Sequence, residues 1–114
     1  FAAEFEKRAK KKPTMVQAGV YSAVLSYLQV VEEIGTDDPD KVTEALRGRE
    51  VNDEIFTTDG VVADNGRMIH TMYLAQVKTP GESSGEWDYY NIVREIPGED
   101  AFLDPAESGC ALVQ

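Results

Sequence analysis

Length, composition and charge narrow the classes of protein to which this chain can belong. It has 114 residues, 42% hydrophobic and 28% charged, which suits one soluble folded domain and is too short for two. Its formal net charge of -10 argues against binding to nucleic acid or to an anionic membrane surface, because both need a basic protein surface.

The first predicted element is a helix over residues 1–12. Phe1 and Phe5 share one face at helical spacing, and Pro13 ends the pattern. The basic run at 10–12 lies where the helix dipole is negative, which favours a role in stabilising the helix end. Because the sequence opens inside this helix, without Met and without a signal peptide, we expect it to be part of a longer protein.

The second predicted helix runs from about residue 17 to residue 34. Its apolar side chains cover most of its circumference, and such a helix is usually buried against a sheet or between neighbours. Gly35 is the expected C-terminal cap, because glycine adopts the left-handed conformation without strain. The apolar stripe consists of Val20, Val24, Leu28 and Val31, widened by Tyr21, Leu25 and Tyr27.

A third, short helix is predicted after the acidic segment 36–40. The spacing of its carboxylates does not match a calcium-binding loop, which needs a central glycine and a distal glutamate. Asp38 instead suits the N-cap position and Pro39 the first helical position. Gly48 is expected to end this helix.

Beyond Val51 the hydrophobic period changes from helical to two. Residues 61–63 and 67–72 predict a β-hairpin, with Asn65-Gly66 supplying a turn that tolerates positive φ. The second strand continues to Val77 with apolar residues on both faces, which predicts a central strand. A loop follows at 79–85, then a strand over 87–96, then a turn-rich surface segment from Pro97 to Gly109.

No residue pattern for catalysis or metal binding is present. One histidine, His70, and one cysteine, Cys110, are too few for a zinc site, and His70 suits a structural hydrogen-bonding role within a strand. Cys110 fits either a small buried apolar residue or one half of a disulfide whose partner lies upstream in a longer protein. We therefore expect no enzyme, no metal and no cofactor.

The segment at the start of the second helix is the candidate binding site. Ligands of open α/β folds tend to bind where a strand or loop enters a helix. Gly19 permits close backbone approach, Gln17 carries an amide, and Tyr21 offers a ring and a hydroxyl. The alternative is that Gly19 and Tyr21 pack the helix against its sheet.

Seven stretches in this order resemble the C-terminal part of the periplasmic solute-binding proteins that serve branched-chain amino acid ABC importers. They are 21–24, leading into a long apolar helix, 34–38, 41–46, 60–66, 66–78, 87–90 and 107–110. The resemblance covers nearly the whole chain. It implies an α/β fold that forms the C-terminal part of a two-lobed clamshell, with helices followed by strands.

The resemblance also implies a division of the chain and a set of binding residues. Residues 1–78 would belong to one lobe, with three helices and then a hairpin, and residues 79–114 would form a hinge-crossing strand and a tail toward the other lobe. Val16, Gln17 and Ala18 match a family position that can touch ligand, and Tyr21 follows them. Because the family often has an aromatic residue where Val16 stands, the solute stays open among amino acids, aromatic acids, amides and urea-like compounds.

The implied function is recognition of a small solute in the periplasm and its delivery to the membrane subunits of an ABC importer, with no nucleic acid involved. Two alternatives stay open. One is the ligand-sensing domain of a receptor or regulator on the same fold, and the other is a free-standing α+β interaction module. As part of a larger body the chain would expose an apolar face and self-associate in isolation.

Overall fold

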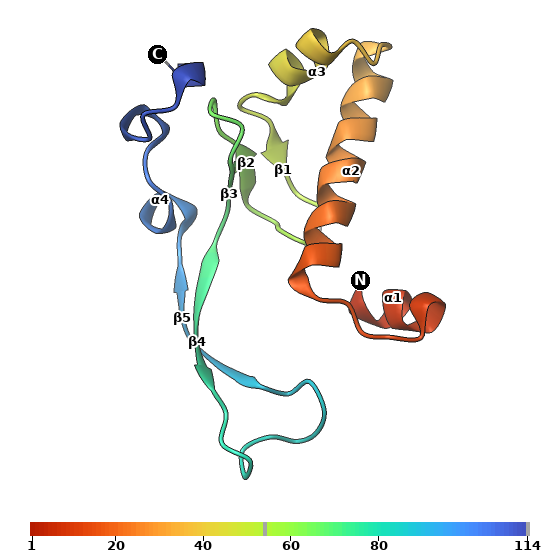
Figure 1. The fold of residues 1–114 in the computed structure, drawn as a ribbon, viewed down its shortest axis with the longest axis vertical. Coiled ribbons are helices and arrows are strands. Elements are labelled where there is room, and N and C mark those ends of the chain that lie inside the picture. The colour runs from red at the N-terminus through yellow and green to blue at the C-terminus, as the bar shows by residue number, and fades with distance from the viewer. Residues whose placement is uncertain (54, 114) are drawn as a thin grey trace.

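A computed structural model describes residues 1–53 and 55–113 of the chain, and it contains helices and strands in the predicted order (Figure 1). Three helices are followed by five strands and a tail of short helical turns. The elements are α1 (Ala2–Ala9), α2 (Met15–Ile34), α3 (Pro39–Leu46), β1 (Glu50–Val51), β2 (Gly60–Val62), β3 (Met68–Ile69), β4 (Met72–Val77), β5 (Tyr90–Ile96) and α4 (Gly98–Ala101).

Helix α1 ends at Ala9, three residues before the predicted end at residue 12. Lys10 ends it by adopting the left-handed conformation, with φ of 57°, and its N–H donates to the carbonyl of Glu6. The helix contacts α2 through an aromatic pair, in which the ring centroids of Phe1 and Tyr21 are 5.5 Å apart. An apolar face on α1 is therefore present as predicted.

Helix α2 begins at Met15, two residues before the predicted start, because Thr14 and Gln17 form a capping box. The Thr14 hydroxyl accepts a hydrogen bond from the N–H of Val16 at 3.2 Å, and the Gln17 side-chain oxygen accepts one from the N–H of Thr14 at 2.8 Å. Gly35, with φ of 69°, ends the helix as predicted.

The burial of α2 differs from the prediction. The expected apolar stripe is exposed, with Val20, Val24 and Leu28 at 58%, 51% and 55% of their accessible surface. The buried residues are instead Ser22, Ser26 and Val30. On the opposite face, the start of the chain contacts Tyr21 through Phe1, and the stripe beyond that contact stays largely exposed in the described part of the chain.

Helix α3 follows its predicted caps. The carboxylate of Asp38 accepts hydrogen bonds from the N–H groups of Asp40 and Lys41, at 3.2 Å each. Arg47 is the C-cap, and Gly48 follows it with φ of 70°, so the chain turns where the sequence predicted. Val42 is the buried residue of this helix.

Strands β1, β2 and β3 form a small antiparallel sheet in that order. The predicted hairpin between β2 and β3 is confirmed, with Ala63 bonded to both Gly66 and Arg67 at 2.8 Å. Gly66 has φ of 79°, whereas Asn65 is not among the residues with positive φ. The turn is thus a three-residue loop with glycine at the left-handed position, and the Asn-Gly pair does not form a two-residue turn.

The predicted strand through residues 67–77 is divided into β3 and β4, which separate at His70 and Thr71. Among the described residues β4 pairs with β5 alone, so the prediction of a central strand is wrong for this chain. Strand β5 starts at Tyr90, three residues later than predicted. We call residues 72–96 the arm, since they extend away from the three-stranded sheet as a long hairpin (Figure 1).

The tail after β5 is built from short turns, as the sequence indicated. Helix α4 is followed by single 3-10 turns at Pro105–Glu107 and Ala111–Val113. The tail returns beside the three-stranded sheet (Figure 1). The buried Gly98 at the start of α4 lies against Ile69, and the ring of Phe102 lies 5.5 Å from that of His70.

The chain exposes much more surface than a complete domain of its size. Its radius of gyration is 17.0 Å, against about 13 Å expected for a compact domain of this length. Its accessible surface is 8484 Å², against roughly 6,200 Å² expected for its mass. The buried apolar residues are Val30, Val42 and Val51, and this small core is what an incomplete body would show.

Candidate functional site

Two apolar grooves flank the first turns of α2, where the sequence placed the candidate site. The first, which we call the helix groove, has a volume of about 630 Å³. The second, which we call the junction groove, has a volume of about 610 Å³. The helix groove is lined by Phe1, Phe5, Val16, Gln17, Val20, Tyr21, Val24, Leu25 and Leu28, and the junction groove by Met15, Val16, Ala18, Gly19, Ile55, Phe56, His70, Thr71, Met72 and Tyr73.

The four predicted binding residues are divided between these grooves. Val16 lines both grooves, and 62% of its side chain is exposed, against 46% for Tyr21. Gln17 and Tyr21 line the helix groove, whereas Ala18 lines the junction groove. Sequence neighbours on a helix point to different sides, so one turn of α2 contributes to both surfaces.

The polar atoms of Gln17 are partly committed to the helix start. Its side-chain oxygen accepts hydrogen bonds from the N–H and from the hydroxyl of Thr14, at 2.8 Å and 2.5 Å. The amide is therefore held at the N-terminus of α2, where it stabilises the first turn. Its side-chain oxygen has less capacity left for a ligand than the sequence suggested.

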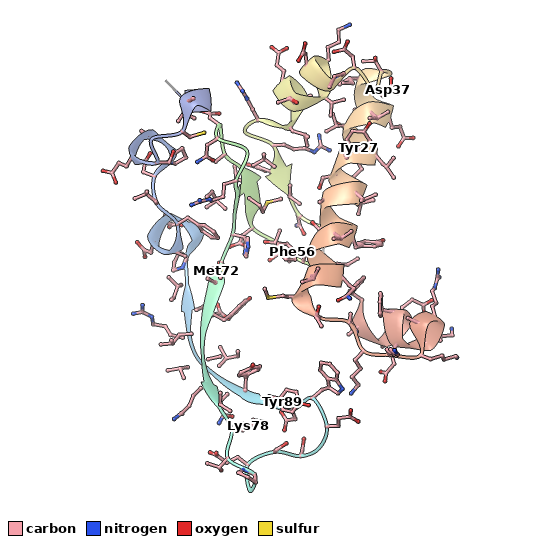
Figure 2. All side chains as sticks on the ribbon, viewed as in Figure 1. Tyr27, Asp37, Phe56, Met72, Lys78 and Tyr89 are labelled. Atoms are coloured by element: carbon pink, nitrogen blue, oxygen red, sulfur yellow. The ribbon has the colours of Figure 1, made fainter. Side chains whose placement is uncertain are left out.

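The junction groove has an aromatic wall that the sequence analysis did not identify. Phe56 lies between α2 and the strands (Figure 2), and its ring centroid is 5.0 Å from that of His70 in an edge-to-face arrangement. A Cβ built on Gly19 would lie 3.6 Å from the Phe56 ring, which is ordinary van der Waals contact. Gly19 therefore faces a side chain at normal distance and does not require glycine on steric grounds.

Asp53 positions Phe56 through hydrogen bonds with backbone N–H groups. One carboxylate oxygen of Asp53 accepts hydrogen bonds from the N–H groups of Ile55, Phe56 and Thr57, at 3.0, 2.8 and 3.2 Å. Burial works to raise the pKa of Asp53, but these N–H groups and the nearby Ser22 hydroxyl outweigh it and lower the pKa. The other Asp53 oxygen and the Ser22 oxygen are buried without a hydrogen bond of good geometry.

His70 makes a structural hydrogen bond, as the sequence predicted, but it lies at the break between β3 and β4 and not within a strand. Its Nδ1 lies 2.8 Å from the carbonyl oxygen of Thr71, which can only accept, so Nδ1 carries the proton and donates. The ring is packed between Phe56 and Phe102. His70 thus joins the loop, the strand and the C-terminal tail.

A carboxylate at the break between β3 and β4 was also missed by the sequence analysis. Asp59 accepts hydrogen bonds from the N–H of Thr71 at 3.2 Å and from its hydroxyl, and from the Thr57 hydroxyl at 2.8 Å. These hydrogen bonds, first from Thr71 and then from Thr57, lower the pKa of Asp59. A lone Asp before Gly60 carries no sequence signal that would predict a partner twelve residues away.

Within residues 1–53 and 55–113, no group of three or more His, Cys, Asp or Glu side chains is placed to hold a metal ion. The helices of this part of the chain are also too short or too polar to span a membrane.

Comparisons with known proteins identify the family. A family model described as "Periplasmic binding protein" matches residues 1–86. No curated protein matches the chain. Among solved structures, a periplasmic binding protein from Burkholderia mallei is 42% identical, with a TM-score of 0.90, over 99% of this chain and 30% of that chain.

A second solved structure is similar to the same extent. It is a branched chain amino acid ABC transporter periplasmic ligand-binding protein from Burkholderia xenovorans, 41% identical with a TM-score of 0.89 over 99% of this chain. The chain spans 30% of the length of each of these two proteins. The resemblance seen in the sequence and the exposed apolar surface of the structure are thereby explained together, and the chain belongs to the periplasmic binding protein family.

Proposed function

We propose that this chain is part of the solute-binding protein of an ABC-type importer, acting in the periplasm on a branched-chain amino acid or a related small solute. The observation that supports this most is the similarity to an ABC transporter ligand-binding protein along 99% of the chain at 41% identity. The partners would be the solute and the membrane subunits of the importer. The role is recognition and delivery, and no catalytic step is proposed.

The division of the chain proposed from the sequence assigns residues 1–78 to one lobe and residues 79–114 to a hinge-crossing strand and a tail toward the other. In such a clamshell the solute is held by contacts from both lobes, and closure is an equilibrium that the solute biases. This chain covers 30% of the similar structures, so it can supply only part of those contacts. We expect it to bind no solute measurably by itself.

We propose Val16, Gln17, Ala18 and Tyr21 as the residues through which this chain contributes to solute binding. Val16 is the best placed of them, because it lies on the border of both grooves and is exposed. The helix groove extends along three turns of α2 and is apolar, which suits packing against another element of the whole protein. The junction groove lies where helix, loop and strand meet and suits a small molecule better.

The same fold also serves ligand sensors, which is the second candidate. Export would distinguish the two, because a signal peptide on the whole protein favours transport and a cytosolic start favours sensing. A free-standing interaction module is disfavoured by the exposed apolar side chains of α2 and of the arm, which a stable monomer of this size would bury.

Titration calorimetry on the whole protein and on the 114-residue chain tests the proposal. The ligands are amino acids, aromatic acids, amides and urea. We expect binding of at least one of them by the whole protein and none by the isolated chain. Absence of binding by a well-folded whole protein, or micromolar binding by the isolated chain, would contradict the proposal.

A pair of matched substitutions tests the site. Val16→Asp should abolish solute binding by the whole protein, because it places a charge on the wall of both grooves. Thr43→Asp introduces the same charge at an exposed polar residue of α3 that lines neither groove, and it should leave binding unchanged. Equal losses in the two variants would remove Val16 from the proposed site.

A further inference from the structure

Two short segments connect the arm to the rest of the chain. The outgoing segment is His70-Thr71, between the end of β3 and the start of β4. The returning segment is Pro97-Gly98, which follows the end of β5 and includes the first residue of α4. Strand pairing within the arm starts at once, since Met72 faces Ile96 in the register of β4 and β5. The two segments therefore lie side by side, and any change in the direction of the arm must occur there.

Close backbone packing holds the two segments together. A Cβ on Gly98 would lie 2.8 Å from a side-chain carbon of Ile69 and 3.1 Å from the backbone nitrogen of His70. Such distances leave no room for any side chain other than hydrogen. We call residues 15–69 the body. At Gly98 the space between the body and the returning segment is so narrow that only glycine fits.

The carboxylate of Asp59 holds Thr71, the last residue of the outgoing segment before the arm. The N–H of Thr71 has no strand partner at the break, and a backbone donor of this kind needs an acceptor. Asp59 supplies it at 3.2 Å and also accepts from the Thr71 hydroxyl. Both contacts of the carboxylate with Thr71 constrain the same residue, so they limit rotation about its backbone.

Asp59 is itself held firmly in the body. Its other oxygen accepts from the Thr57 hydroxyl at 2.8 Å. The next residue, Gly60, is tightly enclosed, since a Cβ there would lie 2.6 Å from Thr57 and 3.1 Å from the carbonyl oxygen of Val51. Asp59 is therefore a fixed hydrogen-bond acceptor in the body, and it restrains Thr71, from which the arm starts.

We propose that Asp59 and Thr71 form a latch that sets the angle between the body (15–69) and the arm (72–96). Asp59 acts as a positioning residue. In the whole protein, where this inference rests on the proposed function, the pivot between the lobes would lie at 70–71 and 97–98 rather than after residue 78, where the division drawn from the sequence put it. The latch would then bias the equilibrium between the open and closed forms. Asp59 lines neither the helix groove nor the junction groove, so breaking the latch at Asp59 would change solute affinity without removing a residue of the proposed site.

A distance measurement between body and arm in the whole protein tests the latch. Spin labels are placed through Thr43→Cys on α3 and Glu86→Cys at the end of the arm, both exposed, with Cys110→Ser to remove the native thiol. Thr71→Val keeps the side-chain shape and removes the hydroxyl. We expect it to displace the mean distance and broaden the distribution, and we expect Thr71→Ser to restore the wild-type distribution.

Thr79 supplies a matched control. Its N–H and hydroxyl donate to the carboxylate of Glu82 at 2.8 Å and 2.6 Å, which reproduces the Asp59–Thr71 pattern within the arm and away from the break. Thr79→Val should leave the body-to-arm distance unchanged. The same displacement in Thr79→Val and Thr71→Val, or none in Thr71→Val, would overturn the latch.

Asp59→Ala provides the second variant, and it should displace the distance in the same direction as Thr71→Val. If Asp59→Ala fails to fold, the conservative Thr71→Val still decides the question. The distances are measured without solute, so they report on the latch even if the whole protein binds none of the solutes tested. If the wild-type whole protein bound none of the solutes, the proposed function would be contradicted, but the distances would still test the latch.

Discussion

Arg49 forms a bidentate ion pair with Glu33, in which Nη1 lies 2.7 Å from Oε2 and Nη2 lies 2.7 Å from Oε1. The pair joins the last turn of α2 to the residue before β1, sixteen positions further along the chain. Planar matching of a guanidinium to a carboxylate gives such a pair directional strength. It holds the end of the long helix over the small sheet.

The pH dependence of this pair follows from its pKa shift. The hydrogen bond from Arg49 lowers the pKa of Glu33, so the pair stabilises the fold above the unfolded pKa of a glutamate and this contribution is lost as the pH falls through the folded value. Arg49→Met should reduce the melting temperature slightly at pH 7 and less at pH 3. Thermal unfolding at both pH values measures this, and a larger reduction at pH 3 would contradict it.

Gly60→Ala should destabilise the fold by about 2 kcal/mol or more, because the added methyl overlaps with packed atoms. The Cβ would lie 2.6 Å from Thr57 and 3.1 Å from the Val51 carbonyl. Gly81→Ala is the control, since nothing lies within 4 Å of a Cβ there. Urea unfolding of the whole protein measures both changes, and equal midpoints for the two variants would refute the packing argument.

Thr14→Ala should destabilise the start of α2, at a cost of about 1 kcal/mol for loss of an N-cap. The hydroxyl bonded to the N–H of Val16 disappears, and the Gln17 side chain loses one of its two donors. Thr14→Ser keeps the hydroxyl and should be near neutral. Chemical unfolding again supplies the measurement, and a Ser variant as unstable as the Ala variant would exclude the cap as the cause.

The isolated chain should self-associate through the exposed stripe of α2, because it leaves more apolar surface in water than a monomer of this size tolerates. Val24→Glu together with Leu28→Glu should shift the chain toward monomer in light scattering. Gln29→Glu adds charge on an exposed part of the same helix outside the stripe and should have little effect. A wild-type chain that stays monomeric at high concentration would count against the exposed face as an interface.

The order of the elements could be predicted from sequence because the signals were local. Gly35, Asp38 with Pro39, and Gly66 mark their turns through backbone preferences that do not depend on distant residues. The extent of α1 was overestimated because Lys10 ends it in a left-handed conformation that lysine rarely adopts.

Burial could not be predicted in the same way, because it depends on what lies opposite each face. The apolar period of α2 predicted that the stripe with Val20, Val24 and Leu28 is buried, yet the described part of the chain buries the serine side of the helix instead. The break in the strand at His70 and Thr71 carries no Gly or Pro, and the N–H of Thr71 is hydrogen-bonded there to Asp59, twelve residues away in sequence. A hydrogen bond between residues this far apart produces no periodic pattern in the sequence from which it could be predicted.

The serine side of α2 has a consequence for how this protein can vary. Ser22 and Ser26 are buried on one side of α2, and we expect the exposed side with Val20, Val24 and Leu28 to be covered in the whole protein. A helix enclosed from two directions has almost no neutral surface on which substitutions accumulate harmlessly. Substitutions in α2 are therefore expected to be tolerated mainly where they keep the size of the side chain.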